Sequence, residues 1–78
     1  MSETLGDRIR MHRARLRMSQ TDLGEKVKLS TNSISAIEQG HTDPKVSMVK
    51  KIAQALGVKA SYLIGEDRDS EKQPALVS

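Results

Sequence analysis

Apolar residues recur at helical spacing from the start of the chain. At about 100° per residue, Leu5, Ile9 and Leu16 fall within roughly 40° of one another, which predicts an amphipathic helix over residues 5–17. A second apolar pair, Leu23 and Val27, follows Ser19, and this segment carries acidic residues suited to a helix N-terminus. A third helix is expected from Ser30, a good N-cap, to the glycine at position 40.

Two further helical segments are expected in the second half of the chain. Apolar side chains repeat at intervals of three and four over residues 46–56, and Gly57 then gives a stop signal. The turn-rich segment 41–44 separates this helix from the preceding one, because a residue before proline disfavours helix. One last turn or two is expected at 61–64. Since no strand-like alternation occurs, the expected fold class is all-α.

The chain of 78 residues has room for one small domain. This domain is expected to cover residues 1–65. Residues 66–78 are charged and contain proline, with too little apolar content to offset the entropy of ordering, so they are expected to form a flexible tail.

Composition excludes several functions. Without cysteine, the chain has no disulfide framework, thiolate zinc site or cysteine nucleophile. Its longest apolar runs are two or three residues, so no membrane span or secretory signal is expected. The net charge is +3, and residues 1–18 alone carry three more basic than acidic side chains. Charge alone leaves two interpretations open, a basic face for nucleic acid or an ordinary solvated helix face.

Catalytic and ligand-binding chemistry is not evident. His12 and His41 lie far apart in sequence without acidic residues at ligand spacing, so no metal site is expected. The single tyrosine and the scattered serines form no arrangement of nucleophile and base. We therefore expect no enzymatic activity, no cofactor and no small-molecule ligand.

The most informative segment is residues 19–40, SQTDLGEKVKLSTNSISAIEQG. Two short helices that cross steeply need a small residue where they touch, an apolar residue in the turn and branched residues beneath the second helix. Gly24 and Leu29 supply the first two, and Ile34 with Ile37 supplies the third. This pattern predicts a helix-turn-helix over residues 20–39.

The outer face of the second of these helices is unusual. With Ile34 and Ile37 taken as the inward direction, its outer half carries small, uncharged, mostly hydrogen-bonding side chains: Thr31, Asn32, Ser35, Ala36 and Gln39. Amides, hydroxyls and methyl groups are what a helix needs to touch base edges in the major groove of DNA. The alternative is a polar face without a partner.

Several spaced motifs resemble the helix-turn-helix domain of phage repressor and Cro proteins, the Xre family. They are LGDRIR at 5–10, MSQTDL at 18–23, TNSISAIEQG at 31–40, ALGV at 55–58 and YLI at 62–64. The resemblance covers residues 5–65 and implies a compact five-helix bundle. It also implies a transcriptional regulator, a repressor that binds an inverted-repeat operator in double-stranded DNA as a homodimer. Such a regulator would be prokaryotic or phage-encoded, cytoplasmic and nucleoid-associated.

The resemblance further implies residue roles. Thr31, Asn32, Ser35 and Ala36 would read base edges. The DNA backbone would be contacted by Gln20, Ser33, Gln39, His41, Thr42 and Lys45, with the minor groove as an alternative for Lys45. Backbone contacts fix the register on DNA, whereas base-edge contacts discriminate between sequences. The candidates for the dimer surface are Val58, Tyr62 and Leu63, with the tail as an outside candidate.

Arg13 and Glu38 each lie at the boundary between the buried and the exposed side of their helix. The family often joins the two residues, and such a pair would clamp the first helix to the third. In the alternative interpretation, both side chains simply face water.

Three residues depart from the family pattern. Arg17 and Lys28 stand where glycine is common, and a left-handed backbone conformation at either residue costs on the order of 1 kcal/mol. His12 stands where an aliphatic residue is usual, so it is either a half-buried residue at the rim of the core or a pH sensor. The alternative function is an antitoxin-like or scaffolding module whose partner is another protein.

Overall fold

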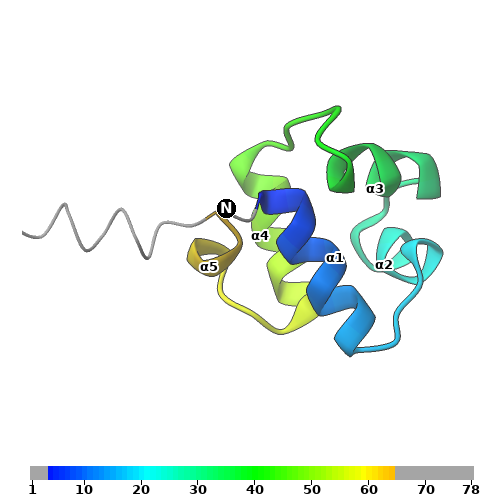
Figure 1. Ribbon diagram of the computed structural model, residues 1–78, viewed down its shortest axis with the longest axis horizontal. Helices are drawn as coiled ribbons and strands as arrows, with labels where there is room; N and C mark the ends of the chain where they lie inside the picture. Colours follow the sequence, from blue (N-terminus) through cyan, green and yellow to red (C-terminus); the bar gives the residue numbers. More distant parts are fainter. Residues whose placement is uncertain (1–3, 65–78) are drawn as a thin grey trace, which may run out of the picture.

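Five α-helices make up residues 4–64, the part of the chain that the computed structural model describes (Figure 1). They are α1 (Leu5–Arg15), α2 (Gln20–Val27), α3 (Thr31–Glu38), α4 (Val46–Leu56) and α5 (Ala60–Ile64). No strand occurs in this part of the chain, so the expected all-α, five-helix fold is confirmed. The tail expected at 66–78 lies outside the described residues, and the domain boundary at 65 therefore stays a prediction.

The first three helices begin at side chains that cap them. The Thr4 hydroxyl accepts a hydrogen bond from the Asp7 backbone N–H, and the Asp7 carboxylate accepts one from the Thr4 backbone N–H. Ser19 and Asp22 form the same reciprocal capping box at α2. At α3, the Ser30 hydroxyl accepts from the backbone N–H of Ser33. These caps satisfy N–H groups that have no partner within a helix.

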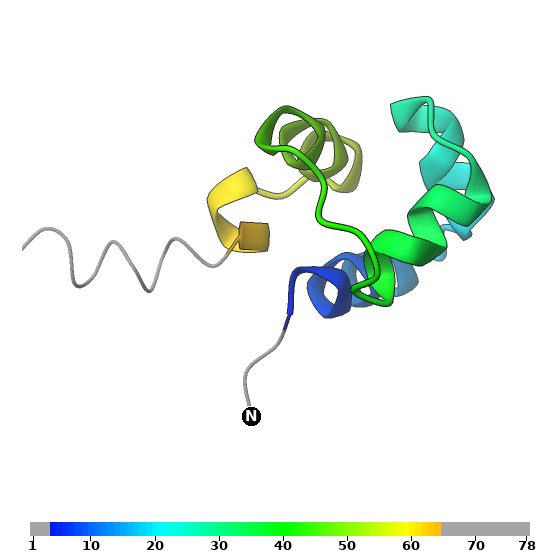
Figure 2. The ribbon, with the colours of Figure 1, turned by 90° about the horizontal axis from the view of Figure 1, so that it is seen from above.

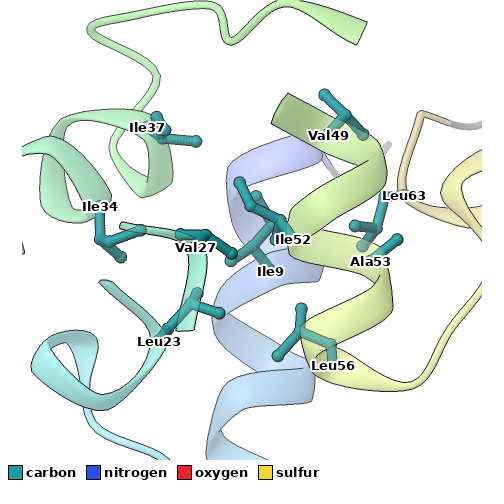
Figure 3. Close-up of a cluster of buried hydrophobic side chains, with 10 residues drawn as sticks. All are labelled: Ile9, Leu23, Val27, Ile34, Ile37, Val49, Ile52, Ala53, Leu56 and Leu63. Carbon is teal, nitrogen blue, oxygen red and sulfur yellow. The ribbon is translucent and has the colours of Figure 1, made fainter. Parts of the chain in front are cut away.

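One aliphatic core holds the helices together (Figure 3). Its buried members are Ile9, Leu23, Val27, Ile34, Ile37, Val49, Ile52, Ala53, Leu56 and Leu63. Every helix contributes at least one of them, and Leu23 and Ile52 are fully buried. Ile34 and Ile37 point inward as expected, so the outer side of α3 is directed away from the core.

Leu16 corrects the predicted extent of the first helix. It was expected on the apolar face of a helix reaching residue 17, but α1 ends at Arg15 and Leu16 is 51 % exposed. Arg17 then adopts a left-handed conformation with φ of 55°, which turns the chain toward α2. Lys28, with φ of 62°, ends α2 in the same way. Both residues therefore adopt the conformation for which the family commonly uses glycine.

A close approach of backbones sets the turn between α2 and α3. A Cβ atom at Gly24 would lie 2.5 Å from the Leu29 carbonyl oxygen, so this position requires the absence of a side chain. The expected small residue at the crossing of the two helices is thus confirmed. Figure 2 shows α2 and α3 together on one side of the domain, while α5 lies on the opposite side next to α4. The outer face of α3 is therefore remote from α5.

Candidate nucleic-acid interface

The outer edge of α3 is accessible. Thr31 and Asn32 are exposed, and Ser35 and Ala36 are half-buried. None of these four side chains belongs to the core. The edge is held from behind by Ile34 and Ile37, which are 1 % and 6 % exposed. The structure thus brings the four predicted base-reading residues to one free surface.

A hollow of about 460 Å³ lies beside this edge, between α3 and the start of α4. Asn32, Ser33 and Ala36 line it from α3, and Thr42 and Lys45 line it from the loop that follows. Ile37 and Met48 give part of its wall an apolar character. Residues predicted to read bases and residues predicted to hold the DNA backbone therefore border the same concave surface.

An ion pair at the C-terminal end of α3 confirms the predicted contact between Arg13 and Glu38. Arg13 donates from Nε to Glu38 Oε2 at 2.7 Å and from Nη2 to Oε1 at 3.1 Å. Its Nη1 donates to the Met18 carbonyl oxygen at 2.8 Å, in the connection between α1 and α2. Glu38 is 5 % exposed, so the alternative in which both side chains face water is wrong. A two-pronged guanidinium–carboxylate contact fixes orientation as well as distance.

Gln20 takes part in the same network. Its side-chain amide donates from Nε2 to Glu38 Oε1 at 3.1 Å. The sequence predicted a phosphate contact for Gln20 and no contact with Glu38. In this structure the Gln20 amide links the N-terminal turn of α2 to the last residue of α3, and its backbone lies at the helix N-terminus.

Three contacts on the exposed surface were missed by sequence reasoning. The Thr21 and Thr31 hydroxyl oxygens lie 2.9 Å apart, joining the N-terminal turns of α2 and α3. Gln39 Nε2 donates to Ser35 Oγ at 2.7 Å, and His41 Nε2 lies 3.1 Å from Gln39 Oε1. The i, i+4 spacing of Ser35 and Gln39 was a usable signal. The Thr21 contact has no signal in sequence, because it depends on how the two helices cross.

The dimer candidates divide into accessible and inaccessible residues. Val58 and Tyr62 are half-buried, whereas Leu63 is 1 % exposed and belongs to the core. Leu63 is therefore corrected to a core residue, since its side chain faces the bundle and is not available to a partner. The next residue, Ile64, is 40 % exposed.

Tyr62 attaches α5 to α1. The Arg8 guanidinium lies 5.1 Å from the centre of the Tyr62 ring, and Arg8 Nη1 donates to the Tyr62 carbonyl oxygen. The His12 ring meets the Tyr62 ring edge-on, with 5.1 Å between centroids. His12 is half-buried, as expected for a residue at the rim of the core, and its buried Nε2 has no hydrogen-bond partner among the residues that the structure describes. These contacts hold α5 against α1.

Two short helices joined by a tight turn, with an uncharged, exposed reading edge on the second, define a helix-turn-helix domain. The chain belongs to the helix-turn-helix family, because the family profile described as "Helix-turn-helix" matches residues 9–63. The resemblance derived from sequence is thereby confirmed. The family consists of DNA-binding transcription regulators, which also confirms the expectation that the chain is not an enzyme.

Named relatives agree with this assignment. The chain is 34% identical over 64 residues to the immunity repressor protein of Bacillus phage phi105, covering 82% of this chain and 44% of that protein. It is 29% identical over 69 residues to the transcriptional regulator ImmR of Bacillus subtilis, covering 88% of this chain and 54% of ImmR. The chain thus spans about half the length of these curated relatives.

A solved structure shows the same fold. The P22 c2 repressor in complex with a synthetic operator superimposes with a TM-score of 0.77 at 32% identity, covering 81% of this chain and 96% of that chain. A separate finding concerns membranes. Within residues 4–64 of this chain, no helix has the length and hydropathy that a membrane span requires.

Proposed function

We propose that this protein is a sequence-specific DNA-binding repressor of transcription, which binds an inverted-repeat operator as a homodimer. The single observation that carries the proposal is the α3 edge, where exposed or half-buried polar and methyl groups are backed by buried Ile34 and Ile37. Relatives named as repressors, and a similar repressor structure that contains operator DNA, support it. Its place of action would be the nucleoid in the prokaryotic cytoplasm.

Base recognition would come from α3 in the major groove. The exposed amide of Asn32 can pair with adenine through N6 and N7, and the Ala36 methyl can touch the methyl group of thymine. Thr31 and Ser35 would add hydroxyl contacts to neighbouring bases. The hollow beside Asn32 and Ala36 gives the edge of a base pair room to approach.

Register on the DNA would come from phosphate contacts around this helix. Ser33 and Gln39 lie on or next to α3, and His41, Thr42 and Lys45 are exposed in the loop that follows. Gln20 retains a second amide hydrogen beside its bond to Glu38, and the α2 N-terminus favours a negatively charged phosphate. With roughly four to six phosphates contacted per subunit, DNA affinity should fall steeply as salt rises.

Dimerisation would double these contacts. Two-fold symmetry places the paired reading helices about 34 Å apart, one turn of the duplex. Val58 and Tyr62 remain candidates for the surface between the subunits, and Ile64 joins them because its side chain is exposed.

Selection of binding sites from random duplexes by the purified protein tests the proposal. We expect an enriched inverted repeat and a protein–DNA stoichiometry of two to one. Asn32→Ala should weaken binding to that site by at least about tenfold while leaving non-specific binding nearly unchanged. Gln54→Ala, which truncates an exposed amide on α4, is the matched control and should have no effect. If no sequence is enriched, a protein-interaction module replaces the proposed function.

A further inference from the structure

A second hollow, of about 400 Å³, lies between the end of α2 and the second half of α4. Its lining residues are Lys26, Val27, Lys28, Lys51, Gln54 and Ala55. We call it the lysine hollow, because its three lysines are all exposed and no acidic residue among residues 4–64 joins them in the lining. None of the predicted DNA contacts and none of the dimer candidates lies in this hollow.

The charges of the lysine hollow are poorly neutralised. Lys28 and Lys51 form no ion pair within the described part of the chain. Lys26 has Asp22 one turn before it on α2, so its charge is balanced in part. Like charges around one concavity raise its positive potential, and an anionic ligand lowers it again. The lysine hollow is therefore suited to carboxylate or phosphate groups.

The lysine hollow and the hollow between α3 and the start of α4, the α3–α4 hollow, lie one after the other along α4. Met48 lines the α3–α4 hollow, and Lys51, one turn further along the helix, lines the lysine hollow. On the facing side, Leu29 and Lys28 divide between the two hollows in the same way. Leu29, Ile37 and Met48 make part of the α3–α4 wall apolar. Together the two hollows form a groove with an apolar end and a cationic end.

The chemistry of this groove favours one class of occupant. Exposed lysines hold an isolated small anion weakly, because water screens each contact. Single-stranded nucleic acid gains much of its affinity from bases stacked on aromatic rings, and among the described residues no aromatic side chain lines either hollow. A protein segment can carry apolar side chains and carboxylates in one chain, so its two contacts reinforce each other. Residues 45–54 rise by about 14 Å at 1.5 Å per residue, a distance that about four or five extended residues span.

We propose that this groove docks an acidic segment of a partner protein, whose apolar side chains enter the α3–α4 hollow while its carboxylates meet Lys28 and Lys51. Asn32 and Ala36 also line the α3–α4 hollow, so a docked segment covers residues that operator DNA needs. The inference rests on the proposed function in this respect, because the segment then acts as an antagonist of operator binding. DNA and the acidic segment exclude each other.

Synthetic peptides of defined composition test the groove directly. Two labelled peptides carry leucine and methionine in one half and glutamate in the other, one peptide for each chain direction. The control peptide has the same composition with the two kinds of residue interleaved. Fluorescence polarisation with the purified protein should give a dissociation constant at least about tenfold lower for the better two-part peptide than for the control. Equal affinities would overturn the inference, because a groove with two different ends distinguishes the two arrangements.

Charge reversal in the lysine hollow removes the cationic end of the groove. Lys28→Glu and Lys51→Glu should each weaken binding of the two-part peptide by at least about fivefold, since attraction becomes repulsion. Lys50→Glu is the matched control, because Lys50 is the exposed neighbour of Lys51 on α4 and lines neither hollow. Its effect should stay below about twofold. An equal loss in Lys50→Glu would show that net charge alone attracts the peptide, which would also overturn the inference.

Amide chemical shifts measured during a titration locate the bound peptide. The largest shifts should fall at residues 28–29 and along residues 47–55, the segments that form the two walls of the groove. Residues 60–64 of α5, which do not line the groove, should shift little. Shifts concentrated on α1 or α5 would place the peptide elsewhere and reject the groove.

Competition with DNA separates the inference from the proposed function. The two-part peptide should displace an operator selected from random duplexes, and Lys51→Glu should keep its operator affinity while losing its sensitivity to the peptide. If no operator is enriched, the proposed function fails, and the direct titration still decides whether the groove binds the peptide. If Lys28→Glu and Lys51→Glu weaken operator binding as much as peptide binding, these lysines serve DNA and the inference is overturned. Simultaneous binding of peptide and operator would overturn it as well.

Discussion

Glu38, the last residue of α3, accepts two hydrogen bonds from Arg13 of α1, at 2.7 and 3.1 Å. Glu38 is the one buried charged residue among residues 4–64, and the Arg13 side chain is 16% exposed. Since Gln20 also donates to Glu38, a single carboxylate joins α1, α2 and α3. The orientation of the reading helix therefore depends on a contact far from its base-reading edge.

Loss of this carboxylate should destabilise the fold strongly. Glu38→Ala leaves Arg13 with no charge partner in a largely buried place, and breaking a buried pair in this way costs roughly 3–5 kcal/mol. We expect a clear fall in melting temperature and in the denaturant midpoint, measured by circular dichroism.

A matched acidic residue provides the control for this loss. Glu25 is exposed on α2 and has no ion pair within the described part of the chain. Glu25→Ala should therefore shift the melting temperature little. Glu38→Gln, which keeps an acceptor oxygen for Arg13, should fall between the two. Equal shifts for Glu38→Ala and Glu25→Ala would show that the pair does not clamp the helices.

Relief of backbone strain at Lys28 should stabilise the protein. This residue ends α2 with φ of 62°, a conformation that costs a side chain on the order of 1 kcal/mol. Lys28→Gly removes that cost, and the greater freedom of glycine in the unfolded chain offsets part of the gain. We expect a net increase of about 0.5 kcal/mol in the free energy of unfolding.

The reverse experiment is available at Gly57, which ends α4 with φ of 75° and has open space where a Cβ would lie. Gly57→Ala should lower stability by about 1 kcal/mol, because it adds strain without a clash. Stabilisation by this substitution, or destabilisation by Lys28→Gly, would contradict the strain argument.

Stability should depend on pH through the two capping boxes. A hydrogen bond from the backbone N–H of Thr4, joined by one from the Thr4 hydroxyl, lowers the pKa of Asp7 below its ordinary value of 3.8. The backbone and then the side chain of Ser19 lower the pKa of Asp22 in the same way. These hydrogen bonds stabilise the charged form of both carboxyl groups in the folded state. At a pH near the pKa, the folded state therefore binds fewer protons at Asp7 and Asp22 than the unfolded state does.

The sign of the pH effect follows from these lowered pKa values. The stabilisation is fully present above pH 3.8 and is lost as the pH falls through the lower pKa values of the folded state. The melting temperature should therefore drop on acidification below about pH 4. The double variant Asp7→Asn, Asp22→Asn should melt lower at neutral pH and show a flatter acid limb. If the melting temperature of that variant falls on acidification as steeply as that of the unaltered protein, other carboxylates cause the sensitivity to acid.

Much of this architecture could be predicted from the spacing of apolar and polar residues along the sequence. The spacing of Ile34 and Ile37 located the outer edge of α3. The contact between Arg13 and Glu38 was implied by the family resemblance, and the boundary positions of the two residues on their helices were compatible with it. Leu16 and Leu63 were misassigned for physical reasons. Leu16 follows the end of α1, where helical periodicity no longer applies, and α5 has only five residues, too few for periodicity to decide which side faces the core.

Two further contacts, those of Gln20 with Glu38 and of His41 with Gln39, were beyond the reach of sequence reasoning. The bond from Gln20 to Glu38 requires the spatial meeting of the start of α2 and the end of α3. The His41 contact to Gln39 depends on the loop, in which Gly40 adopts φ of 82°. Neither contact has a period or a spacing that a pattern of residue types could show.

The exposed Ile64 side chain of α5 provides the last prediction, which concerns the proposed dimer. Ile64 is 40% exposed and lies two residues after Tyr62, whose ring is anchored by Arg8 and His12. A charge placed in an apolar contact between two subunits must be desolvated without a partner, so Ile64→Glu should weaken dimerisation by at least about tenfold. Sedimentation equilibrium measures that change directly. Operator affinity should fall in parallel, whereas the melting temperature of the monomer should change little because the side chain is not part of the core.

Leu16 supplies the matched control for Ile64. It is also an exposed apolar residue, at 51%, and it is the C-cap of α1. The connection from α1 to α2 lies on the side of the domain away from α5 (Figure 1). Leu16→Glu should leave both the dimer and operator binding intact. If instead Leu16→Glu disrupts the dimer and Ile64→Glu does not, the two subunits meet through the α1–α2 connection.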